Sequence, residues 1–353
     1  MNILEHRKGI DKCDLQLIKL LNERTRHVLA IGEMKLKSGQ EIYAPHRERS
    51  VLDRVCRLNP GPITDEGLRA IYREIMSSAL ALEKSLAIAY LGPEATFTHM
   101  AAIQRFGASL RYTAQKTIPD VFTEVSKHRA DYGVVPVENS TEGVVTHTLD
   151  MFVDSDLKIV AQIVLPIRHC LLSQCRRAQI KTLYAHPQSL GQCRDWVRTN
   201  LPRVEVIETS SNARSAELAA AGKNSAAIAG ILAAEKYRVS ILDYDIQDNV
   251  TNATRFLVLG RQCGPPSGRD RTSVMFSLVD RVGALYQALA PFRRYRLNMT
   301  KIESRPSKRK AWEYFFFVDC DGHFADRKVA KALAQLGEHC SYVKVLGSFP
   351  NTE

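Results

Sequence analysis

Two cations share an apolar helical stripe near the start of this 353-residue sequence. At roughly 100° per residue, Arg24 and Lys35 lie about 20° apart around a helix, on a face that also carries Leu20 and Val28. A buried cation destabilises a fold unless an anion meets it. The pattern therefore fits either an anionic ligand or accommodation of the two cations by the chain itself. In the second case the long side chains snorkel to solvent, or Arg24 pairs with Glu83 of a later helix.

Four clusters of amide, hydroxyl and charged side chains offer a second kind of chemistry, because each lies at the expected end of a strand. In open α/β sheets, ligands bind at the carboxyl ends of strands, where helix N-termini present free N–H groups. The alternative is local. Asn139, Ser140 and Thr141 are suited to cap a helix, and Ser189 with Gln192 fits a capping box. The clusters are Gly92–Phe97, Pro136–Gly143, His186–Ser189 and Asn252–Phe256.

The cationic stripe requires a long helix, and apolar residues three or four apart predict one from Leu4 to about Lys37. A second helix is expected from Pro45 to about Leu58. Thr64 is expected to cap a third helix that ends near Ser85. One long and two shorter helices leave apolar surface bare, so we expect two copies of the chain to associate.

The polar clusters require strands, and from Ile88 onward short apolar β runs alternate with helical patterns. This alternation is typical of a mostly parallel α/β sheet, which we expect to form two lobes. The clearest pairs of strand and helix are Tyr132–Val137 with Val144–Phe152, Thr182–Ala185 with Ser189–Asn200, and Ala226–Ala229 with Ile231–Tyr237.

A stretch rich in Gly and Pro, Gln262–Arg269, indicates a linker. Beyond it the predicted order is βαββαβ, which is typical of the ferredoxin-like unit. Its elements are Thr272–Val279, Gly283–Arg293, Asn298–Ser304, Trp312–Asp319, Asp326–Leu336 and Tyr342–Leu346. The sequence thus predicts a multidomain chain with an all-α domain at 1–87, a two-lobed α/β domain at 88–263 and a βαββαβ domain at 271–353.

The composition and charge of the chain argue against several classes of protein and partner. Apolar residues make up 45% and charged residues 25%, as in ordinary globular proteins. No apolar run reaches the roughly 18 residues of a membrane span, and the N-terminus lacks a signal-peptide pattern. The net charge of +11 is spread along the chain, unlike a nucleic-acid-binding face, and suits small organic anions. The eight cysteines form no C-x-x-C pair, which favours reduced cytoplasmic thiols. We expect no metal, cofactor, nucleic acid or membrane partner.

The helical segment resembles the all-helical chorismate mutases. The resemblance implies that chorismate, a dicarboxylate, binds here and rearranges to prephenate without covalent catalysis. It assigns catalysis at the ether oxygen to Lys35 and Glu83, and it implies that Arg7 reaches the site of the partner subunit. The matching stretches are Arg7, Leu20–Arg24, Gly32–Lys35 and Arg47–Glu48. The implied substrate-binding residues are Arg7, Arg24, Lys35, Arg47, Glu48 and Glu83.

Glu83 stands where the mutases often have glutamine. A glutamate donates to the ether oxygen only when it is protonated. We therefore predict a mutase activity that falls as pH rises through the pKa of Glu83.

Residues 88–260 resemble prephenate dehydratases in the order and spacing of four motifs. The resemblance implies loss of the ring hydroxyl and of CO₂ from prephenate to give phenylpyruvate, with Thr254 as the leading catalytic residue. Arg255 either anchors a carboxylate or pairs structurally. Ala95 replaces a common glycine, although alanine disfavours positive φ. The motifs are Tyr90–Glu94, Val135–Ser140, His186–Gln188 and Thr254–Phe256. The implied substrate-binding residues are Thr96, Asn139, Ser140, Gln188 and Arg255.

The C-terminal segment resembles ACT regulatory domains. The resemblance implies an allosteric site for L-phenylalanine, with feedback inhibition of the dehydratase. Gly283 begins a predicted helix, whose free N–H groups suit an amino-acid carboxylate. The alternative is a module that only dimerises. The implied effector-binding residues are Gly283, Ala284, Leu285, Asn298, Glu303, Ser304, Arg305 and Pro306.

Together these features identify the chain as a member of the bifunctional chorismate mutase/prephenate dehydratase family (the P-proteins) of phenylalanine biosynthesis. We expect an isomerase and carbon–oxygen lyase that forms a cytoplasmic homodimer, with pairing of dimers into tetramers left open. One alternative is a dehydratase whose helical segment only dimerises. Another is a ligand-responsive regulator with a DNA-binding N-terminus, although the first helix is too long for a helix-turn-helix.

Overall fold

The structure is a computed structural model that describes residues 2–38, 43–308 and 313–351. The chain divides into two units. The first comprises Met1–Ala87 with Arg105–Arg111, and the second comprises Ile88–Gln104 with Tyr112–Glu353. No helix in the described ranges is both long and apolar enough to cross a membrane.

Three helices build the first unit: α1 (Ile3–Lys37), α2 (Pro45–Arg57) and α3 (Asp65–Glu83). The predicted starts are confirmed. Pro45 is the first residue of α2, and the Thr64 hydroxyl caps α3 by accepting from the Gly67 N–H at 3.1 Å. Much of α1 is exposed in the single chain. Its exposed large apolar side chains are Ile3, Leu4, Ile10, Leu15, Leu17, Ile18, Leu20, Leu21, Leu29, Ile31 and Met34.

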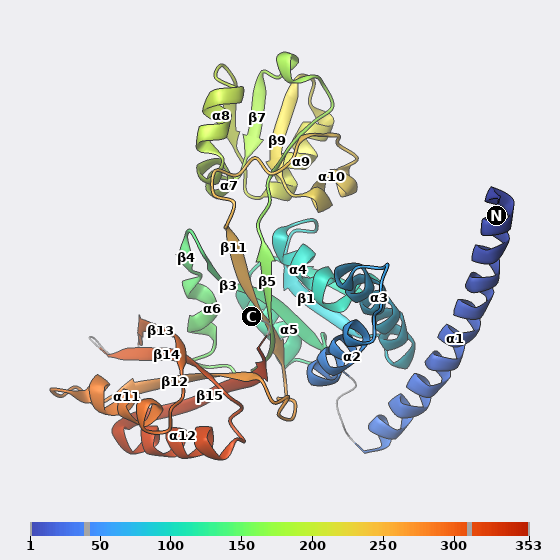
Figure 1. The fold of residues 1–353 in the computed structure, drawn as a ribbon. Coiled ribbons are helices and arrows are strands. Elements are labelled where there is room, and N and C mark those ends of the chain that lie inside the picture. Colours follow the sequence, from blue (N-terminus) through green and yellow to red (C-terminus); the bar gives the residue numbers. More distant parts are fainter. Residues whose placement is uncertain (1, 39–42, 309–312, 352–353) are drawn as a thin grey trace. The chain divides into compact units, whose positions relative to one another are not determined.

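The second unit contains two α/β sheets and a separate C-terminal sheet (Figure 1). The first sheet has the order β2-β1-β3-β11-β5, with β4 paired to β3. Its strands are β1 (Ala87–Leu91), β2 (Arg111–Gln115), β3 (Tyr132–Asn139), β4 (Gly143–Val144), β5 (Lys158–Pro166) and β11 (Ala253–Gly260). The helices of this lobe are α4 (Phe97–Phe106), α5 (Ile118–Ser126) and α6 (Thr146–Met151).

The second sheet has the order β10-β6-β9-β7-β8. Its strands are β6 (Cys170–Ser173), β7 (Thr182–Ala185), β8 (Glu205–Glu208), β9 (Ser225–Ala229) and β10 (Ile241–Asp243). The helices are η1 (Arg177–Gln179, a 3₁₀ turn), α7 (Pro187–Gln192), α8 (Arg194–Asn200), α9 (Asn212–Ala221) and α10 (Ile231–Tyr237). The single helix predicted for Ser189–Asn200 is wrong, because the helical conformation is interrupted at Cys193, between the end of α7 and the start of α8.

The prediction of mostly parallel sheets is also wrong. β1 with β3, and β7 with β8 and β9, are parallel, but β11 runs antiparallel to both β3 and β5. β6 is likewise antiparallel to β9. The reason is the path of the chain, which leaves the first sheet after β5, builds the second sheet and returns as β11. Figure 1 shows β5 and β11 as the two strands that lead toward the second sheet.

The C-terminal sheet confirms the βαββαβ order, with strands arranged β13-β14-β12-β15. The face that carries Phe276 and Val318 is buried against α11 and α12, and this core includes Phe292 and Leu336. The elements are β12 (Asp270–Leu278), α11 (Ala284–Arg294), β13 (Met299–Pro306), β14 (Tyr314–Asp321), α12 (Arg327–His339) and β15 (Cys340–Pro350). Trp312, the predicted start of the third strand, lies outside the described residues.

Candidate functional sites

The cationic stripe of α1 meets Glu83 of α3. Burial raises the pKa of the Glu83 carboxyl, while the charges of Lys35 and Arg24 oppose that rise. Glu83 lies against Gly32, where an added Cβ would be 3.0 Å from the Glu83 Cγ, so glycine makes the approach possible. The Nη1 of Arg24 is buried and has no hydrogen-bond partner within the described ranges. Two cations and one carboxyl thus gather where an anion would complete the charge balance.

Glu48, another expected mutase residue, is paired outside this trio. Glu48 forms an ion pair with Arg105, with 3.0 Å between its Oε2 and the Arg105 Nη2. Arg105 also donates from Nε to the Tyr43 hydroxyl at 2.6 Å, so Glu48 is held by an internal pair. Arg47 and Arg7 are exposed. At 1.5 Å per residue, Arg7 lies about 26 Å along α1 from Arg24, too far to reach the trio of its own chain.

Asn139, the last residue of β3, organises the polar cluster of the second unit. Its Oδ1 accepts hydrogen bonds from the backbone N–H groups of Thr141, at 2.9 Å, and Glu142, at 3.0 Å. With Oδ1 occupied, Nδ2 must face β11. It lies 2.9 Å from the Thr254 Oγ1 and 2.7 Å from the Asn252 Oδ1. Asn139 therefore caps a turn, not a helix as the local alternative expects, and it holds the Thr254 hydroxyl as an acceptor.

The cluster extends through a chain of neutral side chains. Asn252, itself 2% exposed, donates from Nδ2 to the Gln192 Oε1 at 2.9 Å. The same oxygen lies 2.8 Å from the His169 Nε2. Because an amide oxygen accepts, Nε2 carries a proton. Burial lowers the pKa of His169, which favours the neutral ring.

The remaining predicted residues divide into one that joins this cluster and two that do not. Ser140 is bonded to β11, since its Oγ accepts from the Ala253 N–H at 3.0 Å. Thr96 instead caps the start of α4, where its hydroxyl accepts from the His99 N–H at 3.4 Å. Gln188 is exposed. Among the described residues, no recorded hydrogen bond joins Thr96 or Gln188 to Thr254.

Two details of the loops differ from the sequence expectations. The capping box predicted for Ser189 and Gln192 is wrong, because α7 begins at Pro187 after His186. This leaves Gln192 free to join the polar chain. Ala95 does adopt the left-handed conformation, with φ of 66°, and its N–H donates to the His99 Nδ1 at 3.1 Å. That hydrogen bond offsets part of the cost of positive φ at alanine.

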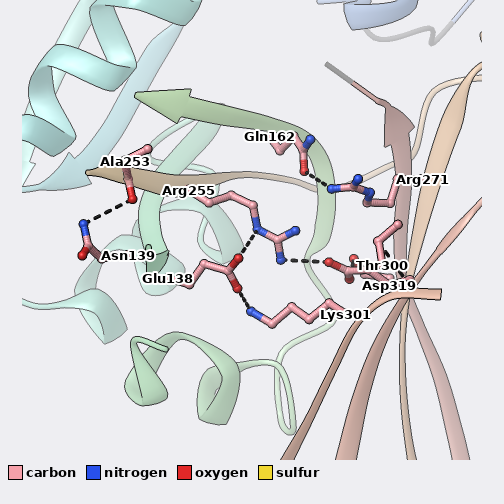
Figure 2. Close-up of polar contacts among 10 residues, drawn as sticks. Glu138, Asn139, Gln162, Ala253, Arg255, Arg271, Thr300, Lys301 and Asp319 are labelled. Carbon is pink, nitrogen blue, oxygen red and sulfur yellow. Dashed lines mark hydrogen bonds and ion pairs between the residues drawn. The ribbon is translucent and has the colours of Figure 1, made fainter. Parts of the chain in front are cut away.

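The Asn252–Phe256 cluster lies at the start of β11, not at a carboxyl end as predicted. Because β11 is antiparallel to β3, its first residues meet the last residues of β3, and Thr254 pairs in register with Asn139. Arg255, the next residue, faces the other way (Figure 2). Its Nη2 donates to the Asp319 Oδ2 of the C-terminal sheet at 2.8 Å, which favours structural pairing over contact with a substrate.

Sequence reasoning did not single out Asn252, Gln192 and His169 as site residues. Asn252 is the first residue of the cluster Asn252–Phe256, and Gln192 lies one helical turn beyond Gln188. Both could therefore have been found from the motif residues next to them. His169 carried none, because its neighbours come from distant segments. In the described part of the chain, no group of three or more His, Cys, Asp or Glu side chains is placed to hold a metal ion.

The expected effector residues lie at the start of α11 and along β13. Gly283 precedes α11 with φ of 77° and no side-chain cap. The Ala284 N–H donates to the Arg281 carbonyl at 3.1 Å, so an anion at this helix start would meet the N–H groups that follow Ala284. Asn298 donates from Nδ2 to the Asp321 Oδ2 at 3.3 Å. Arg305 forms an ion pair with Asp150 of α6, with 3.3 Å between its Nε and Oδ1.

Comparison with known proteins agrees with this architecture. Residues 88–264 match the family model for prephenate dehydratase, residues 6–84 that for chorismate mutase type II, and residues 272–338 that for the ACT domain. A bifunctional chorismate mutase/prephenate dehydratase of Aquifex aeolicus is 49% identical over 98% of this chain and 97% of its own length. One of Neisseria gonorrhoeae is 45% identical over 99% of this chain and 97% of its own.

Among solved structures, a prephenate dehydratase from Arthrobacter aurescens in complex with L-Phe is similar to this chain. It is 34% identical, with a TM-score of 0.70 over 75% of this chain and 90% of its own. Three family models in the same order and relatives that match over nearly their full length lead to one conclusion: the chain belongs to the bifunctional chorismate mutase/prephenate dehydratase family.

Proposed function

We propose that this chain converts chorismate to prephenate in its helical segment and prephenate to phenylpyruvate in its two-lobed segment, under feedback inhibition by L-phenylalanine. The observation that carries the proposal is the pairing of Thr254 with Asn139 at 2.9 Å. This pairing supports the proposal because the Thr254 hydroxyl lies among neutral side chains. Family membership at 49% identity over nearly the whole chain supports both activities.

The dehydratase step follows from how Asn139 holds Thr254. Because the Asn139 Nδ2 donates to Oγ1, the Thr254 hydroxyl accepts in this contact and keeps its own hydrogen for another acceptor. We infer that this hydrogen is donated to the ring hydroxyl of prephenate. The carbon–oxygen bond breaks, the hydroxyl leaves as water, and a proton from solvent water restores the Thr254 hydroxyl. The electrons of the bond to the carboxylate complete the aromatic ring, and CO₂ is released. Aromatisation drives the reaction, so polarisation of the leaving group suffices.

The mutase step uses the trio of Arg24, Lys35 and Glu83. The charge of Lys35 and the buried Nη1 of Arg24 suit a dicarboxylate, which arginine binds in a bidentate manner. Lys35 and a protonated Glu83 would donate to the ether oxygen as charge develops there. The reaction needs no bond to the enzyme, only a compact substrate conformer and these donors.

We propose a homodimer, and association of two dimers into a tetramer is the alternative. The exposed apolar side chains of α1 need a covering surface, and a second copy supplies one of the same chemistry. The proposal also explains Arg7, which lies too far along α1 to serve its own chain but would reach the trio of the partner subunit. We place the enzyme in the cytoplasm, which suits its eight free cysteines.

The regulatory part of the proposal assigns L-phenylalanine to the C-terminal segment. The N–H groups that follow Ala284 in the first turn of α11 suit its carboxylate, and the ACT match over residues 272–338 supports an amino-acid sensor. By linkage, an inhibitor bound here must favour a less active arrangement of the dehydratase segment. The assigned residues are Gly283, Ala284, Leu285, Asn298, Glu303, Ser304, Arg305 and Pro306.

One experiment tests all three assignments. Purified full-length protein is incubated with chorismate, and prephenate and phenylpyruvate are followed with and without L-phenylalanine. We expect prephenate to form and then phenylpyruvate, with phenylalanine slowing only the second step. Dehydration of added prephenate without turnover of chorismate would reduce the helical segment to a dimerisation element. No effect of saturating phenylalanine on the second step would remove the regulatory assignment.

A further inference from the structure

Neighbouring residues at the junction of β3 and β11 point to opposite faces of the sheet, as strand geometry requires. Thr254 pairs in register with Asn139, and both face the polar cluster. Arg255 pairs in register with Glu138 one residue away, and both face the C-terminal sheet. Figure 2 shows the Arg255 and Glu138 side chains directed toward Asp319 and Lys301. The proposed catalytic pair and this charged pair are therefore covalent neighbours on the same two strands.

The four charged residues form one network, which we call the interdomain network: Glu138, Arg255, Lys301 and Asp319. Arg255 donates from Nη2 to the Asp319 Oδ2 at 2.8 Å, and its Nε lies 3.7 Å from the Glu138 Oε1. Lys301 forms an ion pair with the other oxygen of Glu138. The side chains of Arg255 and Asp319 are only 10% and 8% exposed, so solvent screens their attraction little.

The network is anchored firmly on the side of the C-terminal sheet. Asp319 lies on β14 in register with Ser273 of β12 and Lys301 of β13. The Ser273 hydroxyl donates to the Asp319 Oδ1 at 2.5 Å. With one carboxylate oxygen held by Ser273 and the other by Arg255, Asp319 cannot move without moving one of them. A shift of β14 is thereby transmitted to Arg255.

The strand β13 adds a second connection from the proposed effector site. Lys301 and Arg305 lie on the same face of β13, four residues apart, and both form ion pairs with the dehydratase segment, Lys301 with Glu138 and Arg305 with Asp150. The expected effector residues Glu303 and Ser304 lie between them. A ligand that moves β13 therefore acts on Glu138, the residue before Asn139.

Resting on the proposed function, we propose that the interdomain network positions Thr254 and Asn139 for dehydration and couples them to the ligand bound by the C-terminal segment. Arg255 and Glu138 are positioning residues that do not touch the substrate. They hold the start of β11 in register with the end of β3 as long as Asp319 and Lys301 hold them. A change in the C-terminal sheet that alters these ion pairs changes the distance between the Thr254 hydroxyl and the Asn139 amide.

The test uses full-length protein with Asp319→Asn, which removes the charge at constant size, and Arg255→Met, which keeps the apolar stem. In both, we expect dehydratase kcat to fall about tenfold while its KM changes less than about threefold, the signature of lost positioning. Inhibition by saturating phenylalanine should largely disappear, although phenylalanine binding measured by calorimetry stays within about threefold. Mutase activity, measured in the same samples, should equal wild type.

Lys158→Met is the matched control. Lys158 also bridges the two segments, since its Nζ donates to the Val345 carbonyl at 2.9 Å, but it lies at the far end of β5, where its register partner on β11 is Gly260. We expect normal turnover and normal inhibition. Equal loss of inhibition in Lys158→Met would overturn the proposal, because general loosening of the interface would then explain the effect.

Further outcomes separate the possibilities. Full phenylalanine inhibition in Asp319→Asn would overturn the coupling role, and this variant decides the question if Arg255→Met fails to fold. In the double variant, an effect no larger than that of Arg255→Met alone supports a shared pathway, whereas additive effects contradict it. Absence of dehydratase activity from wild type would overturn the proposed function together with this inference. Normal wild-type activity with unchanged variants overturns the inference alone.

Discussion

The helical segment and the two-lobed segment hold their polar side chains in opposite ways. In the helical segment the key groups are charged. Arg24 keeps a buried Nη1 that no described residue binds, and α1 exposes a long apolar surface. In the two-lobed segment the key groups are neutral, and Asn139 uses both its oxygen and its nitrogen within one chain.

This difference shows two ways to build a site from a single sequence. We expect a ligand to neutralise the charges of the helical segment and a second subunit to cover its exposed apolar surface. Neutral amides and hydroxyls can form their hydrogen bonds within the chain before a ligand binds, and these bonds make the site rigid. The mutase site should therefore depend on assembly, whereas the dehydratase site should depend on its internal hydrogen bonds.

The largest effect is expected from Thr254→Ala. Removal of the hydroxyl held by Asn139 takes away the proposed proton donor, so dehydratase kcat should fall about a thousandfold. Mutase activity in the same protein should be unchanged, because its residues lie in the other unit. Thr254→Ser keeps the hydroxyl and should retain most of the activity. Steady-state rates with prephenate provide the measurement, and near-normal turnover in Thr254→Ala would exclude this residue from the mechanism.

A mixing experiment addresses dependence on assembly. Arg24→Ala and Arg7→Ala should each lower mutase activity about a hundredfold through loss of carboxylate binding. If each site combines Arg24 of one chain with Arg7 of its partner, equal co-expression leaves one intact site in half of the dimers. This restores about a quarter of wild-type mutase activity.

The matched control for this experiment is a mixture of Arg24→Ala with Lys35→Ala. Both residues would come from the same chain of each site, so no intact site forms and no activity should return. Failure of the Arg7→Ala and Arg24→Ala mixture to recover any activity would contradict the shared site.

The smallest effect is expected from Glu83→Gln, and it appears in the pH dependence. Burial raises the pKa of Glu83, so the protonated, donating form persists to higher pH than for an exposed glutamate. Wild-type mutase activity should fall as pH rises through that pKa, because the carboxylate cannot donate. Glutamine donates at every pH, so the variant should show a flat profile over the same range. Profiles of kcat that remain superimposable would rule out this role for Glu83.

The elements of this fold follow closely from local sequence signals. Thr64 and Pro45 define helix starts that the structure reproduces, since capping and proline geometry act within a few residues. The direction of β11 did not follow. Its strand pattern is the same whether it runs parallel or antiparallel, and the path through the second sheet decides the direction.

Site residues show the same division between local and distant causes. The motif around Asn139 and Thr254 was recognisable as a pattern, and the structure brings the two side chains together. The partners of Glu48 and Arg255 were not predictable, because Arg105 and Asp319 come from segments far along the chain. Charge alone could not distinguish a residue that binds a substrate from one that binds another domain.

The return of β11 to the first sheet has a consequence for how the enzyme is made. Ala253 pairs with Pro166 although the entire second lobe lies between them, and β11 occupies the position between β3 and β5. The two ends of this long segment come together slowly, and they must do so before β11 can pair with β3 and β5. On the ribosome, the first lobe therefore waits without one of its inner strands until the second has emerged. β11 also carries Thr254, so the sheet is completed and the proposed catalytic residue reaches Asn139 in the same step of folding.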